Sequence, residues 1–134
     1  MGQQQLLLIV LGVIIVGIAV VVGIQMFGSS AASANYDAVV NDLTTFGANA
    51  QGWFKKPTSM GGGGRSFAAV TATVIGIPTS GSNTNGAYTI ESVDPDYFVL
   101  QGVGVEDGDA DGDMCTIQIT VYADSIGSFT EVSR

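Results

Sequence analysis

The pattern of hydrophobic and polar positions divides the chain into three parts. The nineteen residues from Leu6 to Ile24 include no polar side chain. Between Tyr36 and Phe54, apolar side chains recur at steps of three and four, and from Phe67 onward they alternate with polar ones. These patterns are typical of a membrane or core helix, an amphipathic helix and half-buried strands, in that order. The sequence therefore predicts a long N-terminal helical region followed by a sheet.

The apolar segment is long enough to cross a lipid bilayer. As a helix it would be ~28 Å long, close to the ~30 Å hydrocarbon thickness. A secretory signal peptide needs basic residues before the apolar run, and N-myristoylation needs Ser or Thr where the sequence has Leu6, so both are excluded. Gly12, Gly17 and Gly23 allow helices to approach closely. We therefore expect a helix packed among other helices, with a single-pass anchor as the alternative.

The amphipathic helix has recognisable ends. Asp37 lies near its start and Lys55 and Lys56 lie at its end, where their charges complement the helix dipole. Pro57 then terminates the helix. We expect the two helices to form one rod that bends near Gly28–Ser30.

The rest of the chain predicts a flexible glycine-rich linker and an antiparallel sheet. Clusters of Gly, Asn, Asp, Ser and Pro separate the alternating runs, as turn residues do. A sheet laid on the amphipathic helix would bury both apolar faces, which gives an α+β fold. The expected strands are residues 67–77, 87–93, 97–105, 115–122 and 128–132. The expected organisation is an apolar helix (1–27), an amphipathic helix (28–56), a linker (57–66) and a sheet domain (67–134).

Composition excludes several classes of function. Four Lys or Arg residues against twelve Asp or Glu give a net charge of −8, so we expect no nucleic-acid partner. The chain has no histidine, the commonest general base and a usual zinc ligand. No nucleophile has a base beside it in the sequence, so we expect no enzyme. Cys115 is the only cysteine and lies in the alternating run MCTIQITVY, which predicts a small buried residue.

An acidic loop offers a candidate calcium site. Asp107, Asp109 and Asp111 stand at alternate positions and are followed by Gly112 and Asp113. Alternate carboxylates before a glycine match the start of an EF-hand loop, in which they converge on a hard cation. The position that should carry a bidentate Glu is Gln118, inside a predicted strand. A solvated hairpin turn is therefore the alternative to a Ca²⁺ site.

A second loop offers candidate modification sites. The stretch PTSGSNTNG is rich in hydroxyl side chains and has no Asn-x-Ser/Thr sequon. The candidate O-glycosylation sites are Thr79, Ser80, Ser82 and Thr84, and an ordinary loop is the alternative.

An uncharged apolar helix that leads into an amphipathic helix and a small antiparallel sheet resembles the plan of type IV pilins and pseudopilins. The resemblance is carried by MGQQQLLLIVLGVIIVGIAVVVGI and by the helix end AQGWFKKP. In that family the apolar half-helix first anchors the subunit in the inner membrane and later forms the core of a helical filament. The resemblance implies an assembly helix made of Leu6, Leu7, Leu8, Ile9, Val10, Leu11, Gly12, Val13, Ile14, Ile15, Val16, Gly17 and Ile18.

The sequence departs from the family at its N-terminal end. Pilins carry a Glu five residues into the mature chain, where it pairs with a neighbour's terminal amine, and here the first 36 residues contain no acidic residue. Gln5 takes that place if Met1 is the mature terminus. Leu7 takes it if a prepilin peptidase cuts after Gly2 and leaves Gln3 first. A two-residue leader without basic residues would be unusually short, so Met1 is the preferred terminus, with methylation of the terminal residue as in the family.

The leading functional hypothesis is the major structural subunit of an extracellular, pilus-like filament. Such a subunit would be a homopolymer held together by its apolar helix, with an inner-membrane precursor and pilus-type assembly machinery that includes a prepilin peptidase. One alternative is a membrane-anchored pseudopilin of a secretion or DNA-uptake machine. Another is a monomeric, membrane-anchored binding module.

Overall fold

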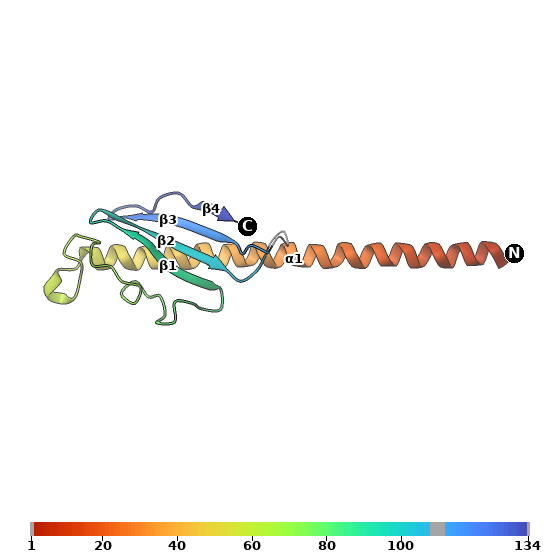
Figure 1. Ribbon diagram of the computed structural model, residues 1–134, viewed down its shortest axis with the longest axis horizontal. Coiled ribbons are helices and arrows are strands. Elements are labelled where there is room, and N and C mark those ends of the chain that lie inside the picture. Colours follow the sequence, from red (N-terminus) through yellow and green to blue (C-terminus); the bar gives the residue numbers. More distant parts are fainter. Residues whose placement is uncertain (1, 108–111, 134) are drawn as a thin grey trace.

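The chain folds as one long helix and one four-stranded sheet (Figure 1). The computed structural model describes residues 2–107 and 112–133. The α+β class is therefore confirmed, as are four of the five predicted strands. In chain order, the elements are α1 (Gly2–Lys55), the short 3-10 helix η1 (Thr58–Met60), β1 (Gly86–Val93), β2 (Tyr97–Gly104), β3 (Thr116–Tyr122) and β4 (Thr130–Ser133).

Helix α1 is a single rod. It contains 54 residues, which makes it ~81 Å long at ~1.5 Å per residue. It ends at Lys55, two residues before Pro57, as predicted. The expected bend near Gly28–Ser30 is wrong: the helix is unbroken there, and Figure 1 shows the ribbon running on in the same direction. Gly and Ser keep their backbone N–H groups, so the helical hydrogen bonds continue, whereas a proline would interrupt them.

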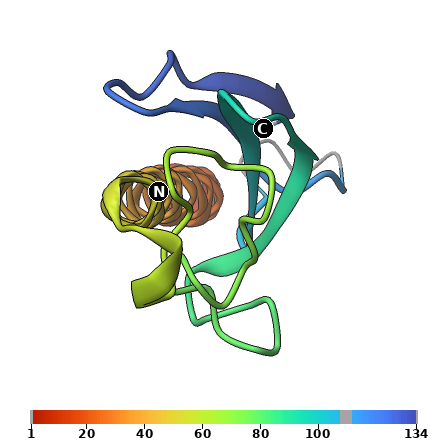
Figure 2. The ribbon, with the colours of Figure 1, turned by 90° about the vertical axis from the view of Figure 1, so that its left-hand side faces the viewer.

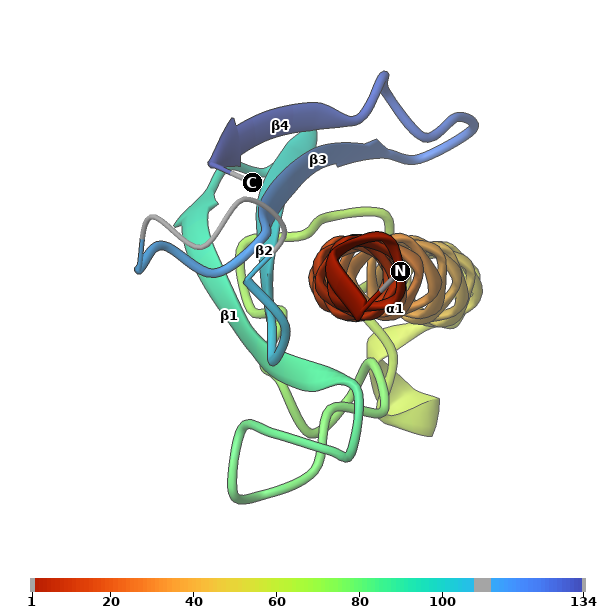
Figure 3. The same cartoon turned by 90° about the vertical axis from the view of Figure 1, so that its right-hand side faces the viewer.

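The two halves of α1 have different surroundings. Residues 2–31 are exposed except for Gly23, which is half-buried. Figure 3, with the N-terminal end of α1 toward the viewer, shows the sheet on one side of the helix. Only the second half of α1 therefore packs against the sheet. Its buried positions recur at helical spacing and are Ala32, Asn35, Val39, Leu43, Phe46, Gly47 and Ala50.

The sheet is antiparallel in the order β1-β2-β3-β4. Leu100 of β2 pairs with Ile119 of β3, and Phe98 pairs with Val121. All four side chains are buried. Successive strand residues point to opposite faces, so this register gives the sheet one apolar face. Figure 2 shows the sheet curving around α1, which brings that face onto the helix.

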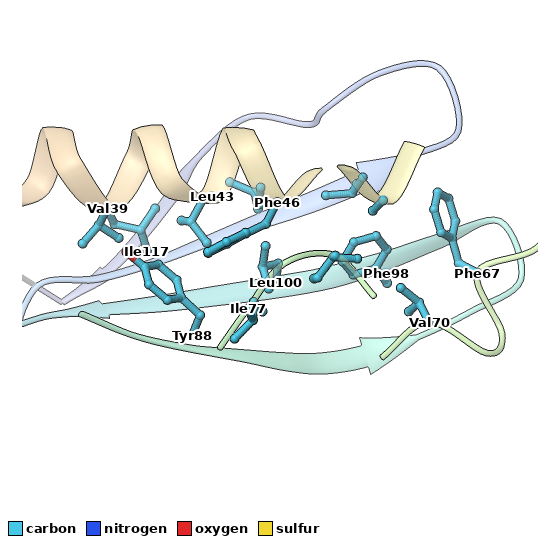
Figure 4. Close-up of a cluster of buried hydrophobic side chains, with 14 of the residues drawn as sticks. Val39, Leu43, Phe46, Phe67, Val70, Ile77, Tyr88, Phe98, Leu100 and Ile117 are labelled. Atoms are coloured by element: carbon cyan, nitrogen blue, oxygen red, sulfur yellow. The ribbon is translucent and has the colours of Figure 1, made fainter. Parts of the chain in front are cut away.

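The core lies between α1 and the inner face of the sheet (Figure 4). Leu43 of α1 and Leu100 of β2 are fully buried there. The rings of Phe46 and Tyr88 meet edge to face with centroids 5.0 Å apart, a favourable geometry for an aromatic pair. Cys115 is buried, as its alternating context predicted. Apolar packing therefore fixes the second half of α1 to the sheet.

The first predicted strand, residues 67–77, is wrong. This segment folds as successive turns, in which the Val70 N–H donates to the Phe67 carbonyl (2.9 Å) and the Ile77 N–H to the Ala72 carbonyl (3.0 Å). The Asn49 side chain on α1 donates to the carbonyl of Ile75 (2.9 Å). Phe67, Val70, Ile75 and Ile77 are buried at steps of three, five and two. Hydrogen bonds within the turns and from the Asn49 side chain occupy backbone groups of this segment, so it needs no partner strand.

The glycine-rich segment after α1 is a hydrogen-bonded cap, and the expectation of a flexible linker is wrong. The Gly63 N–H donates to the Trp53 carbonyl and the Arg65 N–H to the Phe54 carbonyl, both at 2.9 Å. These carbonyls belong to the last turn of α1, which has no intrahelical donors for them. A Cβ at Gly63 would lie 2.6 Å from the Trp53 ring, so the close approach requires glycine.

Candidate functional site

The first half of α1 is an apolar surface exposed on every side. The large hydrophobic side chains between Leu6 and Ile18 leave between 52% (Leu11) and 69% (Leu7 and Val13) of their surface open. A helix turns once in about 3.6 residues, so thirteen consecutive residues pass around it more than three times. The helix is long and apolar enough to cross a membrane. Exposed apolar surfaces of this size mark contacts with protein or membrane.

Three glycines interrupt this surface. A Cβ at Gly12, Gly17 or Gly23 would meet nothing within 4 Å, so these positions are open on the outside of the helix. Beside Gly23, a shallow apolar hollow of about 310 Å³ is lined also by Met26, Phe27 and Ser30. Such gaps accept side chains from a neighbouring helix and let backbones approach.

Asn35 fixes the point at which α1 joins the rest of the fold. Its side chain is 9% exposed, and its Nδ2 donates to the backbone carbonyl of Asn85 (2.8 Å). Its Oδ1 accepts from the backbone N–H groups of Val105 (2.9 Å) and Glu106 (3.4 Å). One helix side chain thus holds the residues before β1 and after β2.

Two turns further along α1, Asp42 makes a second polar attachment. Its Oδ2 accepts from the Tyr88 hydroxyl (2.6 Å) and from the Nδ2 groups of Asn83 (2.9 Å) and Asn85 (2.8 Å). Partial burial alone would raise the pKa of Asp42, but these hydrogen bonds lower it below its usual value. Burial and the Asp42 carboxylate raise the pKa of Tyr88. Asp42 is therefore a charged clamp between α1 and the loop before β1.

Four residues of these attachments were not predicted from the sequence: Asn35, Asp42, Asn83 and Asn85. A signal was present, because Asn35 and Asp42 are polar, lie seven residues apart and fall next to the apolar stripe of the helix. Residues seven apart return to nearly the same helix face. The partners Asn83 and Asn85 lie in a loop, where no periodicity indicates which side chains turn inward.

The structure describes only part of the proposed calcium loop. Asp109 and Asp111 lie outside the described residues. Asp107 Oδ2 accepts from the N–H of Gly112 (2.8 Å), and Asp113 is exposed. Among residues 2–107 and 112–133, no three acidic or cysteine side chains come together as metal ligands do. Gln118 lies in β3 and its Nε2 donates to Gln101 (2.7 Å), so it does not face the loop as a twelfth ligand would. The Ca²⁺ site stays a prediction.

The other candidate residues lie on the surface. Thr79, Ser80, Ser82 and Thr84 are all exposed, and the Ser80 hydroxyl donates to the carbonyl of Ser82 (3.2 Å). Glycosylation there stays a prediction. Of the N-terminal processing residues, Gly2 and Gln3 lie in the first turn of α1 and are exposed, and Met1 lies outside the described part of the chain.

No protein-family model, curated protein or solved structure matches the chain. A long N-terminal helix packed on a small antiparallel sheet is compatible with a pilin-like fold. Function is therefore inferred from the geometry of the described residues, and above all from the exposed half of α1.

Proposed function

We propose that this chain is the structural subunit of a helical, extracellular filament whose core is made of the apolar halves of α1. The observation that carries the proposal is the exposure of residues 2–31 in a molecule whose remaining residues form their own core. Water disfavours such a surface, so lipid or protein must cover it. Packing among copies covers it, and the same contact can be repeated from subunit to subunit.

The rigid connection between the two halves of α1 favours a filament over a tethered binding module. The helix continues without a break from the exposed half into the half that Asn35 and Asp42 attach to the sheet. If the exposed halves pack regularly, every sheet is placed regularly as well. A tethered module would work equally well on a flexible linker, and it would gain nothing from this rigidity.

The apolar half also suits both environments that a filament subunit occupies. Residues 2–36 carry no charged side chain, so no charge is brought into lipid or into a packed core, where it would be costly. The precursor would sit in the inner membrane, with processing and terminal methylation near Met1, Gly2 and Gln3. The mature subunit would then leave the membrane for the filament.

Burial of the apolar half supplies the free energy of assembly. At ~25 cal/mol per Å² of apolar surface, a few hundred Å² buried against each neighbour gives several kcal/mol per contact. A contact between two different surfaces of identical subunits does not close on itself and so produces an open fibre. The proposed assembly therefore needs no disulfide and no ion pair at the helix terminus.

Removal of detergent from the purified protein tests this proposal. Wild-type chain should form filaments by negative-stain electron microscopy once the detergent falls below micellar concentration. Val13→Asp should abolish the filaments, because it places a carboxylate on the apolar half. Val132→Asp is the matched control, since Val132 is also an exposed valine (58%, against 69% for Val13) but lies on β4.

The outcomes separate the alternatives. Filaments from wild type and Val132→Asp but not from Val13→Asp would support the proposal. A wild-type protein that forms no filaments after the detergent is removed, and that remains monomeric in lipid vesicles, would contradict it and favour a membrane-anchored binding module. Short, self-limiting oligomers would favour a pseudopilin.

A further inference from the structure

Three of the four basic residues of the chain gather at one end of the molecule. Lys55 is the last residue of α1 and Lys56 follows it, and the Arg65 N–H donates to the Phe54 carbonyl (2.9 Å). All three side chains are exposed, and none makes an ion pair within the described residues. We name Lys55, Lys56 and Arg65 the basic tip; Figure 2 looks onto this end of α1.

The opposite end of the sheet region carries only acidic charge among the described residues. Glu106 is held against α1 by Asn35, and Asp37 is two residues further along the helix. Asp107 and Asp113 flank the same end, because Val103 of β2 pairs with Thr116 of β3. We name Asp37, Glu106, Asp107 and Asp113 the acidic base.

The tip end carries charges of both signs. Asp94 and Asp96 lie in the β1–β2 turn, where the Phe67 N–H donates to the Pro95 carbonyl. Asp124 lies two residues after Tyr122, whose carbonyl accepts from Gln51. These carboxylates share the tip end with the three cations. The two ends of the sheet region therefore differ, with exposed cations at the tip and none at the base among the described residues.

The axis of α1 relates these two surfaces. Twenty residues separate Asn35 from Lys55, a distance of ~30 Å along the helix. A second copy displaced by about that length along the helix axis would bring its base beside the tip of the first. The exposed apolar half is ~45 Å long, so the two apolar halves would still overlap by ~15 Å.

We propose that, in the filament, the basic tip of one subunit docks on the acidic base of the next subunit along the axis. This inference rests on the proposed filament function and identifies a second contact between copies. The partner is another copy of the chain because the chain itself carries the complementary surface, and because its net charge of −8 repels nucleic acid and anionic lipid. A contact between unlike surfaces propagates without closing.

A charge swap tests the contact with two variants that should assemble only together. Lys55→Glu/Lys56→Glu places an acidic tip against an acidic base. Asp37→Lys/Glu106→Lys/Asp113→Lys leaves only Asp107 negative among the four residues of the base, so the basic tip then meets a basic surface. Asp107 is left unchanged because it accepts the Gly112 N–H. Each variant alone should need a subunit concentration on the order of tenfold or more above wild type to form filaments, because like charges then meet. An equimolar mixture should recover assembly as an alternating copolymer.

Controls separate this contact from net charge and from folding. Thr89→Lys/Glu91→Lys adds positive charge at exposed positions in the middle of β1, away from both the tip and the base, and should assemble like wild type. Circular dichroism and urea unfolding establish that each variant is folded. Recovery in the mixture supports the contact. Variants that assemble alone like wild type, or folded variants that fail even when mixed, would overturn it while wild-type filaments still support the proposed function. If wild type forms no filaments, the proposed function itself fails.

Discussion

The hydroxyl of Tyr88 on β1 donates a 2.6 Å hydrogen bond to the carboxylate of Asp42 on α1. The Tyr88 side chain is 1% exposed, and its ring packs on Phe46 of the same helix. The Tyr88 ring thus lies in the apolar core, and its hydroxyl reaches the polar Asp42 at the edge of that core. Because hydrogen bonds depend on distance and direction, this contact fixes the position of the sheet along α1 more narrowly than apolar packing alone.

Removal of the Tyr88 hydroxyl should destabilise the fold. Tyr88→Phe leaves the ring in place but deprives Asp42 of one of its three donors. We expect a loss of about 1–3 kcal/mol in the free energy of unfolding, as for hydrogen bonds to charged groups. Urea unfolding in detergent measures this free energy. Tyr97→Phe is the control, because Tyr97 is 37% exposed and should lose less than about 0.5 kcal/mol. Equal losses in the two variants would contradict the clamp.

Acid should weaken the same contact. Burial raises the pKa of Asp42, but its hydrogen bonds lower it overall, so the folded-state pKa lies below the unfolded value of ~3.9. The stabilisation is then fully present above the unfolded pKa and is lost as the pH falls through the folded pKa. The difference in unfolding free energy between wild type and Asp42→Asn should therefore be constant from neutral pH to about pH 5 and shrink below about pH 4. A constant difference down to pH 2 would rule out this role.

Two glycines should respond to alanine with opposite signs. A Cβ at Gly102 of β2 would lie 2.8 Å from Val39 Cγ1 and 3.1 Å from the Tyr88 ring, whereas a Cβ at Gly52 of α1 meets nothing within 4 Å. Gly102→Ala should cost about 1–3 kcal/mol through overpacking. Gly52→Ala should stabilise α1 by about 0.5–1 kcal/mol through helix propensity. Thermal unfolding monitored by circular dichroism compares them, and destabilisation by Gly52→Ala would contradict the exposed placement of that face.

Gly17→Phe should distinguish helix packing from simple anchoring. Phenylalanine is apolar, so membrane insertion should be unchanged, but its ring would fill the open position at Gly17 that a neighbouring helix would need. We expect normal membrane fractionation and at least a tenfold loss of filaments, counted by electron microscopy. A tenfold change in an equilibrium constant corresponds to about 1.4 kcal/mol. Ile18→Phe is the control, because it replaces one large apolar side chain with another, and it should still form filaments. Normal filaments from Gly17→Phe would contradict close packing at this glycine.

The sequence was sufficient for the elements whose pattern is regular. The run from Leu6 to Ile24 and the helical spacing from Val39 to Ala50 predicted α1, and the alternation around Ile117 and Ile119 predicted β3 with its buried face. In each case the same requirement, that apolar side chains avoid water, applies to a whole run of residues and leaves a regular pattern in the sequence.

The errors fall where backbone groups find unexpected partners. Residues 67–77 look like a strand, yet their carbonyls and N–H groups bond within turns and to Asn49. The glycines at 61–64 look flexible, yet they are required for a tight cap on Trp53 and Phe54. The clamp of Asp42 with Asn83 and Asn85 joins residues more than 40 positions apart. Contacts of this kind depend on the assembled fold, and local sequence pattern does not encode them.

Photo-crosslinking at Val13 tests most directly whether the apolar half of α1 is covered by copies of itself. A benzophenone amino acid at this position, which is 69% exposed in the isolated chain, would react with whatever lies against it in native cell-surface material. We expect covalent dimers whose crosslinked peptide comes from the apolar half of a second chain. Lipid adducts alone, with no dimer, would contradict the filament.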